Sequence, residues 1–400
     1  MRWVLGAFDF SILLYHRDME FFKKKQSSLY GVMEVGADAI KAMVFEMATD
    51  AALPRVREKF VWDLPVSCSA LRLVKKIRES VFVMTEKIKG VPEKILIALG
   101  HEFGEYALQS WVFPMGDAPL TRKSIREALR ESFYQHADLR RTIISAPVEV
   151  LVNRYPIRQE YWQENDTLSV SRAAEIQFRT LSLFMTVENG AMFAGIKNSL
   201  SGIPIEFIPL VIAEKEALVR DQNVRDAFLI DVGAEATALA SIREGRLIHV
   251  AFMAFGIRRM AEIAAKKYRH PLHEAREMMR HYTDGSIRDE ALIQASAAVA
   301  DATAEWKKIF LQTLDAFYPT GPLSPNVLLS GGGARFPEIR AVVSERDWLG
   351  GFSYAEAPSV RVLEGAAFFG GNTLGGNLQG PEDAGLAALM TYSMSKNLIF

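Results

Sequence analysis

The clearest pattern along the chain is a pair of apolar segments separated by a short turn. Residues 29–35 and 39–47 are mostly apolar, and the turn between them occupies 36–38. Apolar runs of this length, bounded by a glycine-containing turn, are typical of paired β-strands. The same pattern returns in the second half of the chain, with apolar segments at 227–232 and 236–242. The sequence therefore predicts two strand hairpins in related settings.

Segments with helical periodicity alternate with these strands. The longest, 289–317, is rich in alanine and amphipathic. Hairpins that alternate with helices indicate an α/β architecture. The other predicted elements are helices at 71–89, 213–220 and from 258 onward, strands at 94–99, 204–210, 247–252 and 326–330, a glycine turn at 331–333, and helices at 336–344 and 384–393.

A more polar block lies between residues 105 and 173. It contains a strand-like segment, 106–113, and a helix from Thr121, a residue suited to cap it. We expect this block to be a small inserted α+β subdomain. Because 400 residues exceed what one hydrophobic core usually spans, two lobes are expected. The expected boundaries are a leader at 1–28, a first lobe at 29–104 and 174–212, the inserted subdomain at 105–173, and a second lobe at 213–400 with a helical subdomain near 253–320.

Composition narrows the class of protein. Hydrophobic residues make up 49% of the chain and charged residues 24%, as in ordinary globular proteins. The 47 Lys and Arg residues nearly balance the 48 Asp and Glu residues, so no nucleic-acid partner is expected. The single cysteine, Cys68, excludes an intrachain disulfide and a cysteine zinc cluster, and it favours a reducing cytoplasm. No stretch approaches the ~20 apolar residues of a membrane span.

The first residues of the chain have two interpretations. Residues 3–15 are mostly apolar, but Asp9 interrupts them and no small-residue cleavage site follows, so a signal peptide is not expected. Phe21 to Lys25 reads Phe-Phe-Lys-Lys-Lys, and aromatic side chains beside basic ones can rest on an anionic membrane surface. The alternative is a disordered leader upstream of a start at Met19.

The two hairpin turns have the composition of phosphate-binding loops. In each, an acid is followed by one residue and then a glycine, which lets a phosphate approach backbone N–H groups without a Cβ clash. The acids, Glu34 and Asp231, can hold water around a magnesium ion. The candidate nucleotide-binding residues of these turns are Glu34, Gly36, Ala37, Asp231, Gly233, Ala234 and Thr237.

A third glycine turn ends the predicted strand 326–330 and opens a helix. Backbone N–H groups at a helix N-terminus can bind phosphate, and three glycines allow a flat base to lie against the main chain. Its candidate residues are Gly331, Gly332, Gly333 and Ala334. Together the three turns are predicted to clamp a nucleotide between two lobes.

These motifs resemble those of a known superfamily. The two acid-x-glycine hairpins and the Gly-Gly-Gly-Ala turn are similar to the phosphate-1, phosphate-2 and adenosine motifs of actin, the sugar kinases and the heat-shock ATPases. Within that superfamily, the chain looks like the bacterial FtsA and PilM proteins from about Phe21 to Ser393. Residues 245–249 leading to Phe255-Gly256, and Pro119-Leu120-Thr121 before a helix, carry the likeness to FtsA. The resemblance implies an actin-like ATPase (ribonuclease-H-like) fold that binds ATP with Mg²⁺.

The chain departs from the motifs of this family at several positions. Glu34 stands where aspartate is usual, Ala37 replaces a hydroxyl residue, and Ala234-Glu235 replaces a pair of glycines. In the stretch expected to contact ribose, Ala275 is followed by Arg276, and Met279 takes the place of a lysine. We therefore expect nucleotide binding with at most weak hydrolysis. No nucleophile–base pair stands out in the sequence.

The sequence is compatible with three functions. The first is an FtsA-like adaptor of cell division, which would assemble head-to-tail and link a tubulin-like division-ring protein to the inner face of the membrane. The alternative is a PilM-like cytoplasmic scaffold that binds the N-terminal peptide of an inner-membrane pilus protein. Phe21 to Lys25 and the Gly-Ala-Glu run of the second turn favour this alternative. The third, a sugar-kinase-like phosphotransferase, lacks an identifiable catalytic aspartate.

A basic ladder on the predicted helix after Thr121 is a candidate partner site. Its residues are Arg122, Lys123, Arg126 and Arg130. They fall largely on one helix face and could receive an acidic peptide, or they could form an ordinary solvated face.

Overall fold

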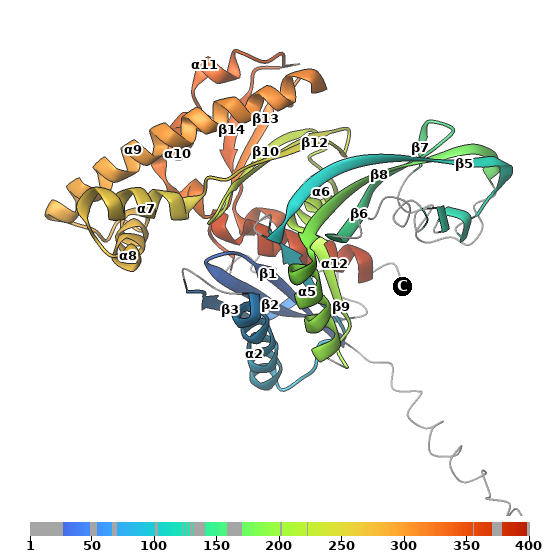
Figure 1. Cartoon of the computed structure of the whole chain (residues 1–400), viewed down its shortest axis with the longest axis horizontal. Coiled ribbons are helices and arrows are strands. Elements are labelled where there is room, and N and C mark those ends of the chain that lie inside the picture. The colour runs from blue at the N-terminus through green and yellow to red at the C-terminus, as the bar shows by residue number, and fades with distance from the viewer. Residues whose placement is uncertain are drawn as a thin grey trace, which may run out of the picture.

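The computed structural model gives the arrangement of three sheets and the helices around them (Figure 1). The predicted leader segment Phe21 to Lys25 lies outside the described residues, as do Arg122, Arg126 and Arg130 of the basic ladder. The structure describes residues 27–48, 54–65, 70–100, 103–121, 123–125, 127–128, 131, 141–157, 170–200, 202–221, 223–354, 356–369 and 378–397.

The first sheet has the strand order β3-β2-β1-β4-β9. Strands β1 and β2 form the predicted antiparallel hairpin, while β4 and β9 continue the sheet in parallel. Helices α2 and α5 pack together on one face, where their apolar side chains join those of the sheet. The bounds are Ser27–Val35 for β1, Ala39–Ala48 for β2, Arg55–Asp63 for β3, Ile95–Leu99 for β4, Ile205–Pro209 for β9, Ala70–Ile88 for α2 and Val187–Ser199 for α5.

The second sheet repeats this arrangement with the order β12-β11-β10-β13-β14. Again an antiparallel hairpin, β10–β11, is followed by parallel pairing to later strands. The bounds of the strands are Ala227–Val232 for β10, Thr237–Arg243 for β11, Arg246–Met253 for β12, Asn326–Ser330 for β13 and Ser359–Val362 for β14. The matching order in the two sheets gives the molecule two related lobes.

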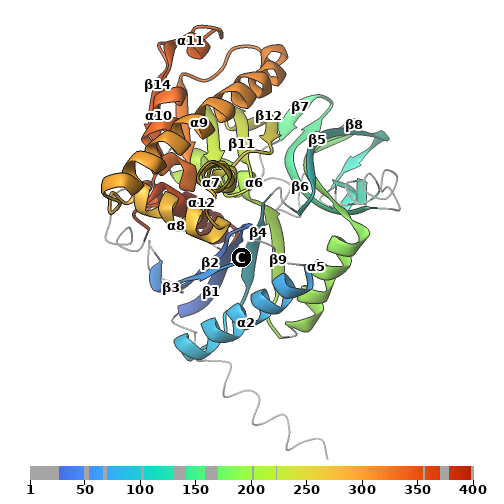
Figure 2. The ribbon, with the colours of Figure 1, turned by 60° about the vertical axis from the view of Figure 1, so that its left-hand side comes forward.

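Helices of the second lobe cover the outer face of its sheet (Figure 2). The long helix α9 places Trp306 and Phe310 in the centre of this core, where both are fully buried. None of the helices in the described part of the chain is both long and apolar enough to cross a membrane. The bounds are Ile257–Tyr268 for α7, Leu272–Thr283 for α8, Asp289–Leu314 for α9, Asp315–Thr320 for η2, Gly332–Arg335 for η3, Pro337–Val343 for α10 and Arg346–Leu349 for α11.

Two helices form the layer between the lobes. Helix α6, Leu210–Asp221, and helix α12, Ala384–Asn397, pack against each other and against both five-stranded sheets. Figure 1 shows α12 between β1 and β10. Residues 386–390 of α12 are completely buried, as expected for a helix that is apolar on all sides. The shorter elements near α12 are η4, Gly365–Phe369, and η6, Pro381–Asp383.

The third sheet is the inserted one, with the order β5-β8-β6-β7 and antiparallel pairing throughout. Its last strand, β8, begins at Val170 and continues to Thr186. The boundary expected at residue 173 therefore falls inside a strand of the inserted sheet, because β8 pairs with β5 and β6 along its whole length. The bounds are Glu105–Leu120 for β5, Arg141–Val152 for β6, Tyr155–Ile157 for β7 and Val170–Thr186 for β8.

The inserted sheet is attached to strand β12 of the second lobe. Tyr106 of β5 stacks on Phe252 with their ring centroids 5.1 Å apart. The buried carboxylate of Glu149 forms ion pairs with Arg179 and Arg246, both at 3.1 Å. Arg179 also donates to the carbonyl of Ile248 at 3.1 Å. Stacking and charge together fix this sheet to the second lobe.

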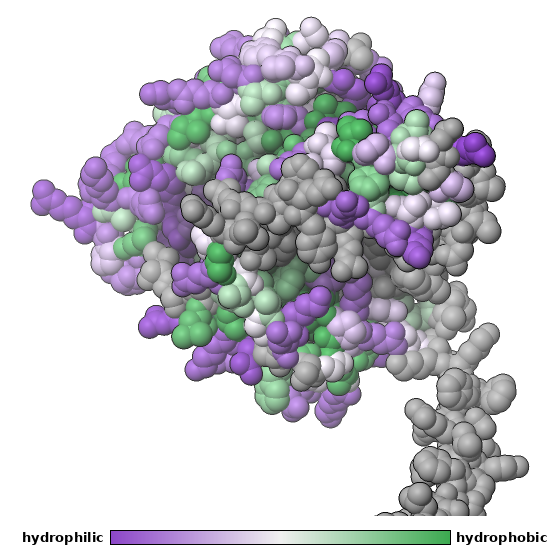
Figure 3. Space-filling view, turned by 45° about the vertical axis from the view of Figure 1, so that its right-hand side comes forward, coloured by the Kyte–Doolittle hydropathy of each residue, from purple (hydrophilic) through white to green (hydrophobic). Residues whose placement is uncertain are grey.

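Hydrophilic and hydrophobic residues are interspersed over the described surface seen in Figure 3.

We expect Glu149→Gln to lower the free energy of unfolding by ~2 kcal/mol, because charge-assisted hydrogen bonds to two arginines are lost. Chemical denaturation monitored by circular dichroism measures this change. The matched control is Glu175→Gln, since Glu175 pairs with the exposed Arg154 and such surface pairs contribute ~1 kcal/mol or less. Equal effects of the two substitutions would contradict this role for Glu149.

Candidate functional site

The three glycine turns meet at one cavity between the lobes. The cavity has a volume of about 250 Å³, and its walls come from the β1–β2 turn, the β10–β11 turn, the turn after β13, and helices α6 and α12. The predicted site residues that line it are Glu34, Gly36, Ala37, Asp231, Gly233, Ala234, Gly331 and Gly332. Segments far apart in the sequence are thus brought together around one space.

The two hairpin turns have the same hydrogen bonding. The N–H of Gly36 donates to the carbonyl of Ala39 at 3.0 Å, and the N–H of Gly233 donates to that of Ala236 at 2.8 Å. In the third turn, Gly331 has φ +81°, and a Cβ atom there would lie 2.3 Å from Oδ1 of Asp231. Only glycine fits at that position, because both the backbone conformation and the approach to Asp231 exclude a side chain.

Three predicted site residues are not among those that line the cavity, because they belong to the surrounding core. Thr237 is fully buried, and its hydroxyl donates to the Phe255 carbonyl at 2.8 Å and accepts from Trp306 Nε1 at 3.0 Å. Gly333 packs against Val232, whose Cγ1 would lie 2.1 Å from an added Cβ. Ala334 is also completely buried. These residues support the turns from behind.

The cavity contains charged residues that the sequence did not single out. Lys41 of β2 donates to Glu34 Oε1 at 3.1 Å and to the carbonyl of Glu382 at 2.6 Å. Glu214 of α6 lines the cavity with only 1% of its surface exposed. Both are charged residues within apolar segments, a pattern that could have marked them as functional candidates.

Three carboxyl groups in the cavity influence one another. Burial raises the pKa of Asp231 to about 6, and the charge of Glu34 adds to the effect while Lys41 opposes it. Burial also raises the pKa of Glu214 well above its usual value, with further contributions from Asp231 and Glu34. Burial would lower the pKa of Lys41, but Glu34 raises it and the net shift is upward. The cavity therefore favours protonated carboxyl groups at moderately acidic pH.

Three carboxyl oxygens of residues that line the cavity lack partners among the described residues. They are Oε2 of Glu34, Oε1 of Glu214 and Oε2 of Glu382, all buried. Unpaired buried acceptors are costly, so this arrangement suits a ligand that brings protons or a hydrated cation. Within the described ranges, no group of three or more His, Cys, Asp or Glu side chains is placed to hold a metal ion directly. Magnesium held through water by Glu34 and Asp231 remains a prediction.

At the mouth of the cavity, Arg258 of α7 contacts both hairpin turns. Its guanidinium lies 2.7 Å from Asp38 Oδ1 and also forms an ion pair with Glu235. Glu235 stands where the family has a glycine, and this ion pair offsets its negative charge. Arg276 contacts Asp38 at 3.3 Å, while its neighbours Ala275 and Met279 are buried in the core.

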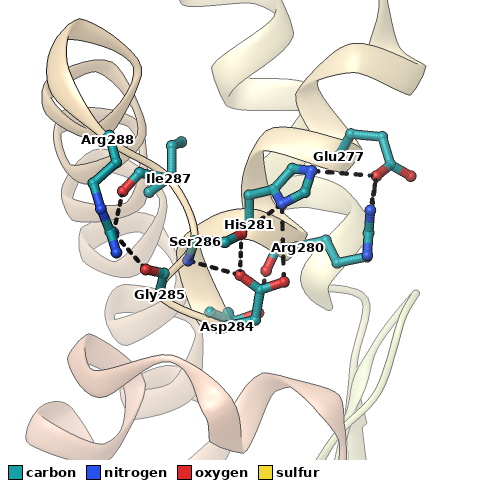
Figure 4. Close-up of polar contacts among 9 residues, drawn as sticks. Glu277, Arg280, His281, Asp284, Gly285, Ser286, Ile287 and Arg288 are labelled. Atoms are coloured by element: carbon teal, nitrogen blue, oxygen red, sulfur yellow. Dashed lines mark hydrogen bonds and ion pairs between the residues drawn. The ribbon is translucent and has the colours of Figure 1, made fainter.

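A serine–histidine contact lies elsewhere in the second lobe, and no motif in the sequence predicts it. Nδ1 of His281, in the last turn of α8, is 2.6 Å from Oγ of Ser286 in the loop that follows (Figure 4). The Ser286 hydroxyl also donates to Asp284, whose Oδ1 accepts the Ser286 N–H at 2.9 Å. The three residues lie in one exposed turn and line neither of the two cavities described here. We interpret the contact as a means of ending the helix.

The basic ladder cannot be placed as a whole, because only Lys123 is among the described residues. Lys123 is exposed and lies 3.8 Å from Glu127, one helical turn away. The acidic-peptide site on Arg122, Lys123, Arg126 and Arg130 therefore stays a prediction.

Comparison with known proteins shows which class of fold this is. No protein-family model and no curated protein sequence matches the chain. A solved structure of the PilM–PilN type IV pilus biogenesis complex matches 91% of this chain and 97% of its own, with a TM-score of 0.63 and 16% identity. The ethanolamine utilization protein EutJ from Carboxydothermus hydrogenoformans matches 84% of each chain, with a TM-score of 0.46 and 12% identity.

The fold is that of the actin-like ATPases, as the sequence resemblance implied. The similarity at a TM-score of 0.63 is to the PilM–PilN structure. A particular likeness to FtsA is not shown.

We expect Asp231→Asn to raise the free energy of unfolding at pH 7.5 by ~1–2 kcal/mol. The folded protein holds the pKa of Asp231 at about 6, above its ordinary value of 3.8, so ionisation at neutral pH opposes folding. Each unit of difference between the folded and unfolded pKa values corresponds to ~1.4 kcal/mol of folding free energy. Solvent in the cavity screens part of this effect. The gain should fade as the pH falls through about 6. Denaturation at several pH values tests this, and a variant less stable than the wild type at pH 7.5 would refute it.

Proposed function

We propose that this chain is an actin-like nucleotide-binding scaffold of the PilM kind, which binds ATP with Mg²⁺ between its lobes. The observation that carries the proposal is the convergence of all three glycine turns on one cavity. Two of these turns come from hairpins with the same hydrogen bonding in two related lobes. A single ligand held by both lobes would therefore fix their relative position.

The residues of the cavity fit the proposed ligand. The glycines of the hairpin turns leave room for phosphate beside the backbone, because an added Cβ at Gly36 would meet only the carbonyl of Ala39 at 3.4 Å. Glu34 and Asp231 would hold a magnesium ion through water, which would offset their mutual repulsion. Lys41 would contribute a positive charge toward the phosphates. Magnesium, when bound, neutralises the negative charge of the phosphate chain.

Hydrolysis is proposed to be slow. Ala37 offers no hydroxyl to a phosphate, so a hydrogen bond to an ionised group, worth ~1.5–3 kcal/mol, is not made there. The protein is accordingly proposed to use nucleotide binding to set its conformation, and head-to-tail self-association remains a prediction.

For the partner, the pilus role is now preferred over the division role that we first expected. The support is the likeness in fold to a chain of the PilM–PilN complex over 91% of this protein. By that analogy, the partner is the N-terminal peptide of an inner-membrane pilus protein, bound at the inner face of the membrane.

We expect Lys41→Gln to weaken binding of Mg·ATP by about tenfold or more, because the charge of Glu34 is then left facing the phosphates. Isothermal titration calorimetry on the full chain measures the affinity. The matched control is Lys59→Gln, since Lys59 pairs with Asp383 at 2.6 Å and does not line the cavity. If the wild type fails to bind Mg·ATP, or if the two variants bind equally well, the proposed site is wrong.

A capture experiment separates the two proposed partners. The full chain is immobilised and offered either the N-terminal cytoplasmic peptide of a PilN-type protein or the purified tubulin-like division-ring protein. We expect the peptide to be retained, and less of it on an Arg126→Glu/Arg130→Glu variant if the basic ladder receives it. Retention of the division-ring protein alone would return the division role to first place.

A further inference from the structure

The cavity between the turns adjoins a larger groove, and the two share part of their walls. The groove has a volume of about 710 Å³ and lies between helices α7 and α8, the turn after β13 and the end of β3. The residues that line both spaces are Asp38, Ile257, Gly332 and Glu382. A ligand that extends from the groove into the cavity must pass between these residues.

The ion pair between Asp38 and Arg258 lies at this boundary. Asp38 lines both spaces, Arg258 lines the groove, and Glu235 lines the cavity. Arg258 Nη2 is 2.7 Å from Asp38 Oδ1 and 3.2 Å from the carbonyl of Ala37. With only 13% of its side chain exposed, the guanidinium is held among its partners.

The backbone of Arg258 is fixed to the second hairpin turn. The N–H of Ile257 donates to Gly233 at 3.0 Å, and the N–H of Arg258 donates to Ala234 at 2.8 Å. An added Cβ at Gly256 would lie 2.4 Å from the Ala234 carbonyl, so this contact is as close as a backbone allows. The side chain of Arg258 therefore reaches from one turn of the site to the other.

The charges around Arg258 are matched. Asp38 and Glu235 contribute two carboxylates, and Arg258 and Arg276 contribute two guanidinium groups. A phosphate chain entering between the turns would be repelled by both carboxylates. It would also be a strong partner for the guanidinium, because arginine and phosphate form bidentate, charge-assisted hydrogen bonds. Phosphate and carboxylate thus compete for the same group.

We propose that Arg258 binds the phosphate chain of the nucleotide at the point where the chain passes from the groove into the cavity. Asp38 and Glu235 compete with the phosphates for the guanidinium of Arg258. The assignment rests on the proposed nucleotide function and names a phosphate contact within that site. Binding must separate Arg258 from at least one of its carboxylates, which lowers the affinity. Nucleotide binding also changes how the lobes are linked. The direct ion pair between Arg258 and Asp38 gives way to a contact made through the bound phosphates.

The test compares variants that move affinity in opposite directions. Mg·ATP and magnesium tripolyphosphate, which is a phosphate chain without a nucleoside, are titrated calorimetrically into the full chain. We expect Arg258→Gln to weaken both by about tenfold or more, and Asp38→Asn or Glu235→Gln to tighten both by about threefold or more. A gain in affinity cannot come from damage to the fold.

Two matched controls accompany these variants. Arg259→Gln changes the next arginine of α7, which pairs with Glu262 and Glu305 and lines neither space. Asp63→Asn removes another acid of the groove wall. The affinity of this variant for both probes should stay within about twofold of that of the wild type, because solvent screens more distant charges.

The outcomes distinguish this inference from the function on which it rests. If Arg258→Gln binds like Arg259→Gln, or if neither carboxamide variant tightens binding, the role of Arg258 is overturned while nucleotide binding stands. If the wild type binds tripolyphosphate with the expected pattern of variants but does not bind Mg·ATP, nucleotide function falls and the phosphate contact stands. If it binds neither probe, both are overturned.

Discussion

The packing of α6 and α12 between the two lobes is the contact on which the rest of the structure depends. Both five-stranded sheets bury their inner faces against this pair of helices, so the lobes share one hydrophobic core at their base. The gap above that core is what the three turns surround. Helix α12 approaches strand β1 so closely at Gly385 that an added Cβ there would lie 2.9 Å from Glu34 Oε2. The geometry of the site is thus set by apolar packing below it.

That packing also explains how the molecule tolerates an unfavourable set of charges. Glu34, Glu214 and Asp231 lie in a largely enclosed space, where burial and mutual repulsion raise the pKa values of Asp231 and Glu214. Lys41 offsets only part of this cost. Functional sites commonly reduce stability in this way, and the surrounding core has to compensate. The fully buried Trp306, hydrogen-bonded to Thr237 behind the second turn, is part of that compensation.

Much of the fold could be predicted from the sequence because apolar patterns and glycine turns are local signals. The hairpins and the long helix α9 lie close to their predicted bounds. Strand β3, Arg55–Asp63, was not predicted, since an edge strand with several charged residues resembles a loop. The site was predicted only where glycines mark it. Lys41 and Glu214 carry a weaker signal, a charge within an apolar segment, but their place in the cavity and the role of Arg258 depend on which distant elements meet. The sequence could not show that Thr237, Gly333 and Ala334 lie behind the cavity wall, since the direction of a side chain is not visible in a turn motif.

The stacked pair Tyr106 and Phe252 links the cavity to the inserted sheet. Both rings line the cavity, one from the first strand of the inserted sheet and the other from the second lobe. The Tyr106 hydroxyl also donates to the carbonyl of Leu99, at the end of a first-lobe strand, at 2.7 Å. The first lobe, the second lobe and the inserted sheet therefore meet at one aromatic contact in the wall of the cavity. A change in the position of either ring would be felt by the inserted sheet directly, through side-chain contact.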